Sequence, residues 1–259
     1  MTMQMKTKGL ILKVVNLNDN DRLFTIQTVE KGKITAIAKG VRSHKHKDFS
    51  ALGHFCFSNF VLDAKTNLYY ISSAEVVNNF YDIRTSVEKV SYATYFMDVV
   101  NNISDSISGD DEYFRFVLNT LYMLGSAEKY AQDENISLEL RKLKAIFEMK
   151  TACYLGYQPY VNGCSRCLGK KNLRFFDVIN GGILCDDCVV SSDALIPAKI
   201  DTLRTLYKIV YSDYKNVFKV SVNEDFIDEL ECISEKFLLQ KLEYYFSSLD
   251  YLKRITYNS

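Results

Sequence analysis

The chain has no tryptophan, only three histidines, and no apolar stretch near the roughly 18 residues that cross a bilayer. Its first six residues also lack the apolar core of a secretory signal. The patterns G-x-x-x-x-G-K-[ST], G-x-S-x-G and H-E-x-x-H are missing, and His44, His46 and His54 stand in no recognisable acid–base arrangement. These absences argue against a membrane protein and an enzyme, and they predict a cytoplasmic binding protein.

Net charge is absent as well, because 32 Lys and Arg residues balance 32 Asp and Glu residues. The distribution is nevertheless uneven, with net values of +5 for residues 1–80, −7 for 81–140, +7 for 141–175 and −5 for 176–259. Blocks of one sign predict local contact with a polyanion that the sum over the chain conceals. The alternative is that folding interleaves these charges into a featureless surface.

What the sequence does contain is two C-x2-C pairs, Cys164 with Cys167 and Cys185 with Cys188. This spacing is typical of a zinc site, the alternatives being unrelated buried thiols or a redox pair. Four thiolates complete a tetrahedral shell and leave no position for water or substrate, so one structural, non-catalytic Zn²⁺ is predicted. The remaining cysteines are interpreted as small buried hydrophobes; they are Cys56, Cys153 and Cys232.

The segment around the cysteines, about residues 160–192, has the pattern of a small hairpin. Leu173, Phe175 and Val178 are strand residues, and the Asn-Gly-Gly sequence at 180–182 predicts the turn that returns the second cysteine pair to the first. A hairpin of this size buries little core, so the metal is expected to supply its folding energy. Four cations should offset the thiolate charge and partly face a partner; they are Arg166, Lys170, Lys171 and Arg174.

Residues 1–80 predict a β-domain. Five short strands are expected at 10–15, 23–28, 34–38, 55–62 and 68–72. Short strands without a sustained helical period suit a small closed barrel such as the OB-fold.

From about residue 81 the apolar period becomes helical. Helices are predicted at about 81–100, 112–124, 137–155, 200–211, 224–232 and 234–252. The expected class is therefore α+β: an N-terminal OB-fold β-barrel over 1–80, then an α-helical domain over 81–259 with an inserted four-cysteine zinc finger.

The densest basic run of the predicted barrel lies between its third and fourth strands. Its cations, Lys39, Arg42, Lys45 and Lys47, are expected to contact backbone phosphates of DNA, and three more are expected to extend that path: Lys8, Lys13 and Arg22. The alternative is a solvated charged loop. Strand aromatics are mostly core, with one or two as candidate platforms for unpaired bases.

A second basic cluster is predicted on a helix, where Arg141, Lys142 and Lys144 lie close together. Such a face would bind phosphate or an acidic peptide tail. A solvated helix surface is the alternative.

Several short motifs, in order along the chain, resemble those of the bacterial recombination mediator family RecO. They are EKGK at 30–33, AKGVR at 38–42, AE at 74–75 with Phe80, LGYQP at 155–159 and GGILCDDC at 181–188. The resemblance covers nearly the whole chain. It implies an OB-fold joined to a helical domain with an inserted finger, and a role in recombinational DNA repair on the nucleoid.

The same resemblance implies the activity and the partners. Family members bind single- and double-stranded DNA, anneal complementary strands, and help the recombinase displace single-strand-binding protein together with RecR. Arg141, Lys142 and Lys144 would then receive the acidic C-terminal tail of single-strand-binding protein. A zinc-ribbon adaptor that docks acidic proteins without binding DNA is the alternative function, and a nuclease is a third.

Overall fold

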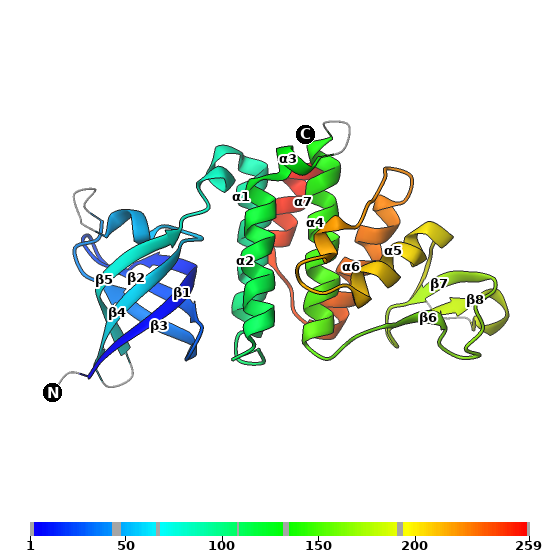
Figure 1. Cartoon of the computed structure of the whole chain (residues 1–259), viewed down its shortest axis with the longest axis horizontal. Helices are drawn as coiled ribbons and strands as arrows, with labels where there is room; N and C mark the ends of the chain where they lie inside the picture. The colour runs from blue at the N-terminus through cyan, green and yellow to red at the C-terminus, as the bar shows by residue number, and fades with distance from the viewer. Residues whose placement is uncertain are drawn as a thin grey trace. The chain divides into compact units, whose positions relative to one another are not determined.

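A computed structural model describes residues 3–42, 48–65, 68–107, 109–131, 135–190 and 194–257. Its contacts divide the chain into two compact units, which Figure 1 shows in one view. The first unit joins residues 1–114 to the C-terminal segment 246–259, and the second spans residues 115–245. Each unit is described by itself below.

The first unit contains a closed five-stranded barrel (Figure 1). Its strands are β1 (Met3–Asn16), β2 (Arg22–Thr28), β3 (Gly32–Ala38), β4 (Phe57–Lys65) and β5 (Leu68–Asn78). They follow the order β1-β2-β3-β5-β4, and β1 pairs with β4 to close the ring. All pairs are antiparallel except β3 with β5. This arrangement is the OB-fold, as the sequence predicts.

The long strand β1 closes the barrel because it serves two neighbours. Its first half pairs with β4 and its second half with β2, and Gly9 takes part in both ladders. A Cβ atom at Gly9 would lie 2.5 Å from Cγ2 of Ile26, so only glycine allows this close approach. The barrel is filled by alternating apolar side chains, with Ile11, Phe24 and Phe60 at its centre.

The first unit also contains two short 3-10 helices, η1 (Phe49–Leu52) between β3 and β4 and η2 (Tyr81–Thr85) after β5. Its two longer helices are α1 (Val87–Ile103) and α7 (Ser247–Tyr257). Lys33 of β3 donates a hydrogen bond from Nζ to the carbonyl oxygen of Asn101, at 3.1 Å, and so ties the barrel to α1. Strands therefore give way to helices near residue 80, as predicted, but the compact unit continues into α1.

The second unit is built around α4 (Ile136–Tyr154), which begins at Asn135, whose side chain accepts a hydrogen bond from the Leu138 amide. Around it lie part of α2 (Asp111–Gly125), then α3 (Ala127–Tyr130), α5 (Ile200–Tyr211), η5 (Val217–Lys219) and α6 (Ile227–Leu242). Residues on every side of α4 are buried, including several charged ones. A helix buried all round shows no clear amphipathic period.

Between α4 and α5 the chain forms a four-stranded sheet of order β6-β8-β7-β9. The strands are β6 (Tyr160–Cys164), β7 (Leu173–Asp177), β8 (Gly182–Cys185) and β9 (Leu195–Pro197), with η4 (Asp186–Cys188) after β8. The hairpin of β7 and β8 is the predicted one. Strands β6 and β9 were not predicted, because each is short and pairs at an edge of the sheet.

The helix prediction at the C-terminal end was wrong in its boundaries. The sequence predicts a break near residue 233, whereas α6 runs to Leu242 and ends at Glu243, which adopts a left-handed conformation with φ of 48°. Helix α7 starts only at Ser247 and belongs to the first unit. The apolar period continues through residue 233, so only the backbone at Glu243 ends the helix.

Candidate metal centre and nucleic-acid interface

The four predicted metal ligands lie together at the tip of the small sheet. The Sγ atoms of Cys164, Cys167, Cys185 and Cys188 are all within 4.8 Å of one another. Cys167 and Cys185 are separated by 3.7 Å between their Sγ atoms. A tetrahedral ion with metal–sulfur bonds of about 2.3 Å requires sulfur–sulfur edges of about 3.8 Å, whereas a disulfide requires about 2.05 Å. The geometry therefore fits a shared metal ion.

The first cysteine pair sits in a tight turn that directs amides at sulfur. The Cys164 amide donates to the Gly169 carbonyl at 2.8 Å, and the Leu168 amide donates to the Cys164 carbonyl at 2.9 Å. Burial raises the pKa of the Cys164 thiol, but hydrogen bonds from the amides of Cys167, Cys185 and Arg166 outweigh burial and lower it to about 6.

The base and the tip of the finger are held by different forces. At the base, Phe176 of β7 is fully buried and packs edge-on against Phe237 of α6, with ring centroids 5.4 Å apart. At the tip, the described buried cluster is Cys164, Leu184 and Cys185, with five partly buried residues packed against it. So small a cluster buries little apolar surface, so an ion held by the four thiols would add to the stability of the tip.

The cations near the finger are partly engaged. Arg166 donates a hydrogen bond to the Cys188 carbonyl, and Arg174 lies 3.8 Å from the carboxylate of Asp186. Lys170 and Lys171 are exposed. Two of the four predicted cations therefore support the finger, and two face solvent.

We expect that replacing Gly163 by alanine weakens metal retention. A Cβ atom there would lie 2.9 Å from the Gly169 carbonyl oxygen, which accepts the Cys164 amide, so the turn would have to shift. The rate of metal loss to a chromogenic chelator measures the effect. Gly156→Ala is not a suitable control, because the φ of 88° at Gly156 strains any side chain. Gly169→Ala is the comparison variant: a Cβ atom there would lie 3.2 Å from the Cys167 Sγ atom, so its effect on metal retention should be smaller. Equal rates for Gly163→Ala and the wild type would contradict the expectation.

The predicted phosphate loop starts at one end of the barrel. The Gly40 amide donates to Oδ1 of Asp21 at 2.9 Å, and Nη1 of Arg42 donates to the Asn18 carbonyl at 2.8 Å. The loop after β3 is thus tied to the loop between β1 and β2. Lys45 and Lys47 lie outside the described residues.

Three of the predicted DNA contacts gather at this end. Arg22 pairs with Ala38 across β2 and β3, and the exposed residues Lys39 and Arg42 follow directly. Nζ of Lys39 lies over the ring of Tyr70, 5.6 Å from its centroid. The cations therefore border an aromatic side chain of β5, a combination that suits contact with phosphates and bases.

Acidic neighbours modify this basic end. Nη1 of Arg42 lies 3.9 Å from the exposed carboxylate of Asp19. Hydrogen bonds from Asn18 and from the Gly40 amide keep the pKa of Asp21 below its usual value. Sequence reasoning did not foresee that the acidic loop lies beside the basic one.

Lys8 and Lys13 lie elsewhere on the barrel. Gly9 pairs with Thr28 and Asn16 with Arg22, so Lys8 is near the far end of β2 from Arg22. At about 3.4 Å per residue the eight-residue separation along β1 between Lys8 and Asn16 is roughly 27 Å. Lys13 is exposed between them. A path through all these cations would need several nucleotides.

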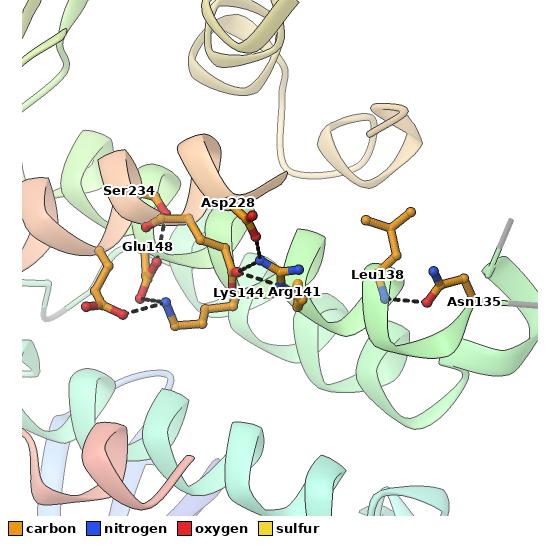
Figure 2. A network of polar contacts seen from close by, with 9 residues as sticks. Asn135, Leu138, Arg141, Lys144, Glu148, Asp228 and Ser234 are labelled. Carbon is orange, nitrogen blue, oxygen red and sulfur yellow. Dashed lines mark hydrogen bonds and ion pairs between the residues drawn. The ribbon is translucent and has the colours of Figure 1, made fainter. Parts of the chain in front are cut away.

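The predicted basic helix face is not open. Lys144 is buried, with Nζ 3.0 Å from Glu148 and 2.9 Å from Glu235, and Lys142 lies 2.6 Å from Glu139 (Figure 2 shows the Lys144 pairs). Their side chains are 3% and 9% exposed, respectively. The expectation of an exposed face must be corrected, because α4 turns these cations toward acidic partners within the unit.

Arg141 joins the same network from α4 to α6. Its Nε donates to Glu231 at 2.6 Å, and its Nη2 pairs with Asp228 (Figure 2). All these partners on α6 are 87 to 91 residues away in sequence. Binding of an acidic tail at these three cations stays a prediction, and it would require breaking these internal pairs.

The centre of the network is a fully buried ion pair. Burial raises the pKa of Glu148 to about 7, although Lys144 and a hydrogen bond from Ser234 oppose the rise. Burial lowers the pKa of Lys144, but the charges of Glu148, Glu235 and Glu231 outweigh it and raise the value. The neighbouring carboxylates therefore favour the charged form of Lys144.

Across the described residues, none of the helices combines the length and hydropathy needed to cross a membrane.

The class of protein follows from these features. It has an OB-fold barrel, and after it a helical region with a finger whose four cysteines could hold a metal ion. Two family models match this chain: recombination protein O N terminal over residues 1–80, and recombination protein O C terminal over residues 84–250. The chain belongs to the RecO family of DNA repair proteins.

Individual relatives match the sequence of this chain over nearly their whole lengths. The DNA repair protein RecO of Acetivibrio thermocellus is 30% identical over 252 residues, which cover 97% of each chain. Those of Caldicellulosiruptor saccharolyticus and Clostridium novyi are each 29% identical, and the matches cover 96% and 98% of this chain and 98% and 96% of the relative. The sequence motifs thus identified the family correctly.

Proposed function

We propose that this protein is a non-enzymatic recombination mediator that binds single- and double-stranded DNA without sequence preference and anneals complementary strands. The observation that carries the proposal is the gathering of Arg22, Lys39 and Arg42 at one end of an OB-fold barrel, beside the ring of Tyr70. Phosphate contacts of this kind position DNA and carry no sequence information.

The proposal includes the partners that the family implies. RecR would join this protein in loading the recombinase, and the acidic tail of single-strand-binding protein would bind to it, in the cytoplasm and on the nucleoid. The metal of the finger is proposed to be a single structural Zn²⁺, because four thiolates are a preferred donor set of zinc and complete its shell.

Replacing Lys39, Arg42, Lys45 and Lys47 together by alanine should weaken DNA binding and flatten its salt dependence. Each phosphate contact to single-stranded DNA contributes about 0.7 to the slope of log affinity against log salt, so losing four lowers the slope by about 3. Fluorescence anisotropy of a labelled oligonucleotide across a salt series measures both quantities, and a strand-annealing assay follows the activity.

The control removes the same charge elsewhere on the surface. It carries alanine at four exposed cations outside the loop: Lys6, Lys129, Lys236 and Arg254. It should keep the wild-type slope within about 1. A loop variant that is folded, retains metal and binds DNA with the wild-type slope would remove the loop from the DNA site. Magnesium-dependent cleavage by the wild type would overturn the non-enzymatic assignment.

A further inference from the structure

The solvent side of α5 carries an unusual set of side chains. Leu203, Leu206 and Ile209 are buried on one side of the helix, whereas the other side exposes a continuous row. Its members are Ile200, Arg204, Tyr207, Lys208 and Tyr211. At 1.5 Å per residue this row is about 16 Å long, enough for two or three nucleotides of an extended strand.

Two tyrosine rings dominate this row. Tyr207 is 44% exposed and Tyr211 is 49% exposed, and their ring centroids are 4.7 Å apart with a 51° angle between the planes. The pair is one helical turn apart. Rings that are half exposed leave part of their surface open to solvent, which a core tyrosine does not.

Cations from two elements lie near one of these tyrosines, Tyr207. Lys170 of the finger and Arg204 and Lys208 of α5 border one pocket of about 360 Å³, together with Tyr207. The finger thus places a cation beside α5. Residues 166–174 contain four basic and no acidic residues, and residues 199–219 contain five basic and two acidic ones.

The acidic residues near the row leave most of this charge available. Arg204 lies 3.2 Å from Asp201 of the preceding turn, but its side chain is 68% exposed. Among the described residues, neither Lys170 nor Lys208 lies within ion-pair distance of a carboxylate. A polyanion can therefore approach.

Aromatic faces flanked by exposed cations are the chemistry of single-stranded nucleic acid binding, in which bases stack and phosphates meet Lys and Arg. A duplex buries its base faces and cannot use the tyrosines. An acidic peptide with an apolar side chain would use the pocket and its cations, but Tyr211 is not part of that pocket. Single-stranded DNA accounts for both tyrosines.

We propose that the exposed side of α5, with the finger loop, is a second DNA surface selective for unpaired strands, where bases stack on Tyr207 and Tyr211 and phosphates contact Arg204, Lys208 and Lys170. This inference rests on the proposed function and adds to it a site outside the barrel. Bases stacked on the tyrosines become available for pairing only after the strand is released. A duplex has no free base faces to stack there, so the surface favours single strands over duplex.

The test compares three DNA probes with the metal-loaded full chain: a single-stranded oligonucleotide, the same length as duplex, and a base-free strand. Tyr207→Ala with Tyr211→Ala should weaken single-strand binding about tenfold or more, since each stacked base is worth a measurable share of affinity. Binding to duplex and to the base-free strand should stay within about twofold. Tyr207→Phe with Tyr211→Phe should retain wild-type binding, because phenylalanine still stacks.

A matched control exists on the same unit. Tyr122 and Tyr130 form another exposed tyrosine pair, 50% and 44% exposed, and their replacement by alanine should leave all three affinities unchanged. A wild type that binds no DNA would overturn the proposed function itself. A wild type that binds DNA, with an unchanged alanine variant, would overturn only the α5 surface.

Two further results would also overturn this inference. Equal losses on all three probes would show that the tyrosines support the fold or the charge and not stacking. Unchanged DNA affinity, with lost binding of a synthetic acidic peptide that ends in an apolar residue, would assign the surface to a protein partner.

Discussion

Replacing Cys164 by serine is expected to release the metal and unfold the tip of the finger, residues 164–188, while the barrel and the helices remain folded. The tip buries only a small cluster, so metal binding must supply its folding free energy, which for structural zinc in small fingers is about 10–16 kcal/mol in apparent terms. The base of the finger should persist, because Phe176 packs against Phe237 of α6 without help from the metal.

Metal content by mass spectrometry and hydrogen exchange of tip amides measure the two parts of this expectation. Exchange should become fast in peptides from the tip and stay slow in α4 and α6. The control is Cys232→Ser, which removes a half-buried thiol of α6 outside the cluster and should keep one zinc per chain. A Cys164→Ser protein with a protected tip and full metal would disprove the four-thiolate site.

The clustering of the four cysteines was predictable because its signal is local. Two C-x2-C pairs and a glycine turn specify the ligands, and the hairpin of β7 and β8 brings them within 4.8 Å of one another. The barrel was predictable for a similar reason, since short strands separated by turn residues pair mainly with sequence neighbours. What the sequence did not show is that Gly9 must lie close to Ile26 where β1 changes partners.

The basic helix face was not predictable, because its meaning depends on a distant segment. Arg141, Lys142 and Lys144 read as a surface cluster when the helix is considered alone. Their exposure is decided by α6, which supplies Asp228, Glu231 and Glu235 about 90 residues later. The charge blocks predicted contact with a polyanion, but for these three cations the structure shows pairing with acidic side chains of the same unit.

The exposed row of α5 illustrates the opposite case. Tyrosines in a helix more often pack into the core, and the sequence offers no reason to separate Tyr207 and Tyr211 from the many others. The three-dimensional arrangement of the finger beside α5 is what brings Tyr207 and Lys170 to one pocket.

Replacing Lys144 by methionine is expected to destabilise the helical unit by about 3–5 kcal/mol, the usual cost of removing one partner of a buried ion pair. Methionine fills the space of the lysine stem but leaves Glu148, which is fully buried, beside Glu235 without the cation that both contact. Hydrogen exchange of amides in α4 and α6 reports this loss locally, so that unfolding of the barrel does not confuse the reading.

The loss should depend on pH in a defined direction. The pKa of Glu148 is raised by burial to about 7, above its usual value of 4.5, so its contribution to stability is full below pH 4.5 and declines as the pH rises through 7. Removing the cation raises this pKa further. The Lys144→Met protein should therefore lose less stability at about pH 6, where Glu148 is protonated, than at about pH 8. At about pH 8 the buried Glu148 must take up a proton at a pH that favours its release.

A second substitution separates charge from packing. Lys144→Met with Glu148→Gln removes both charges, and the amide oxygen still accepts the hydrogen bond from Ser234. The double variant should regain most of the lost stability, because a buried neutral pair is cheaper than a lone buried carboxylate, and it should lose the pH dependence that Glu148 causes, because glutamine does not titrate. A loss below about 1 kcal/mol in the single variant at about pH 8 would show that Glu148 reaches water or another cation, and the network would then not bind α4 to α6.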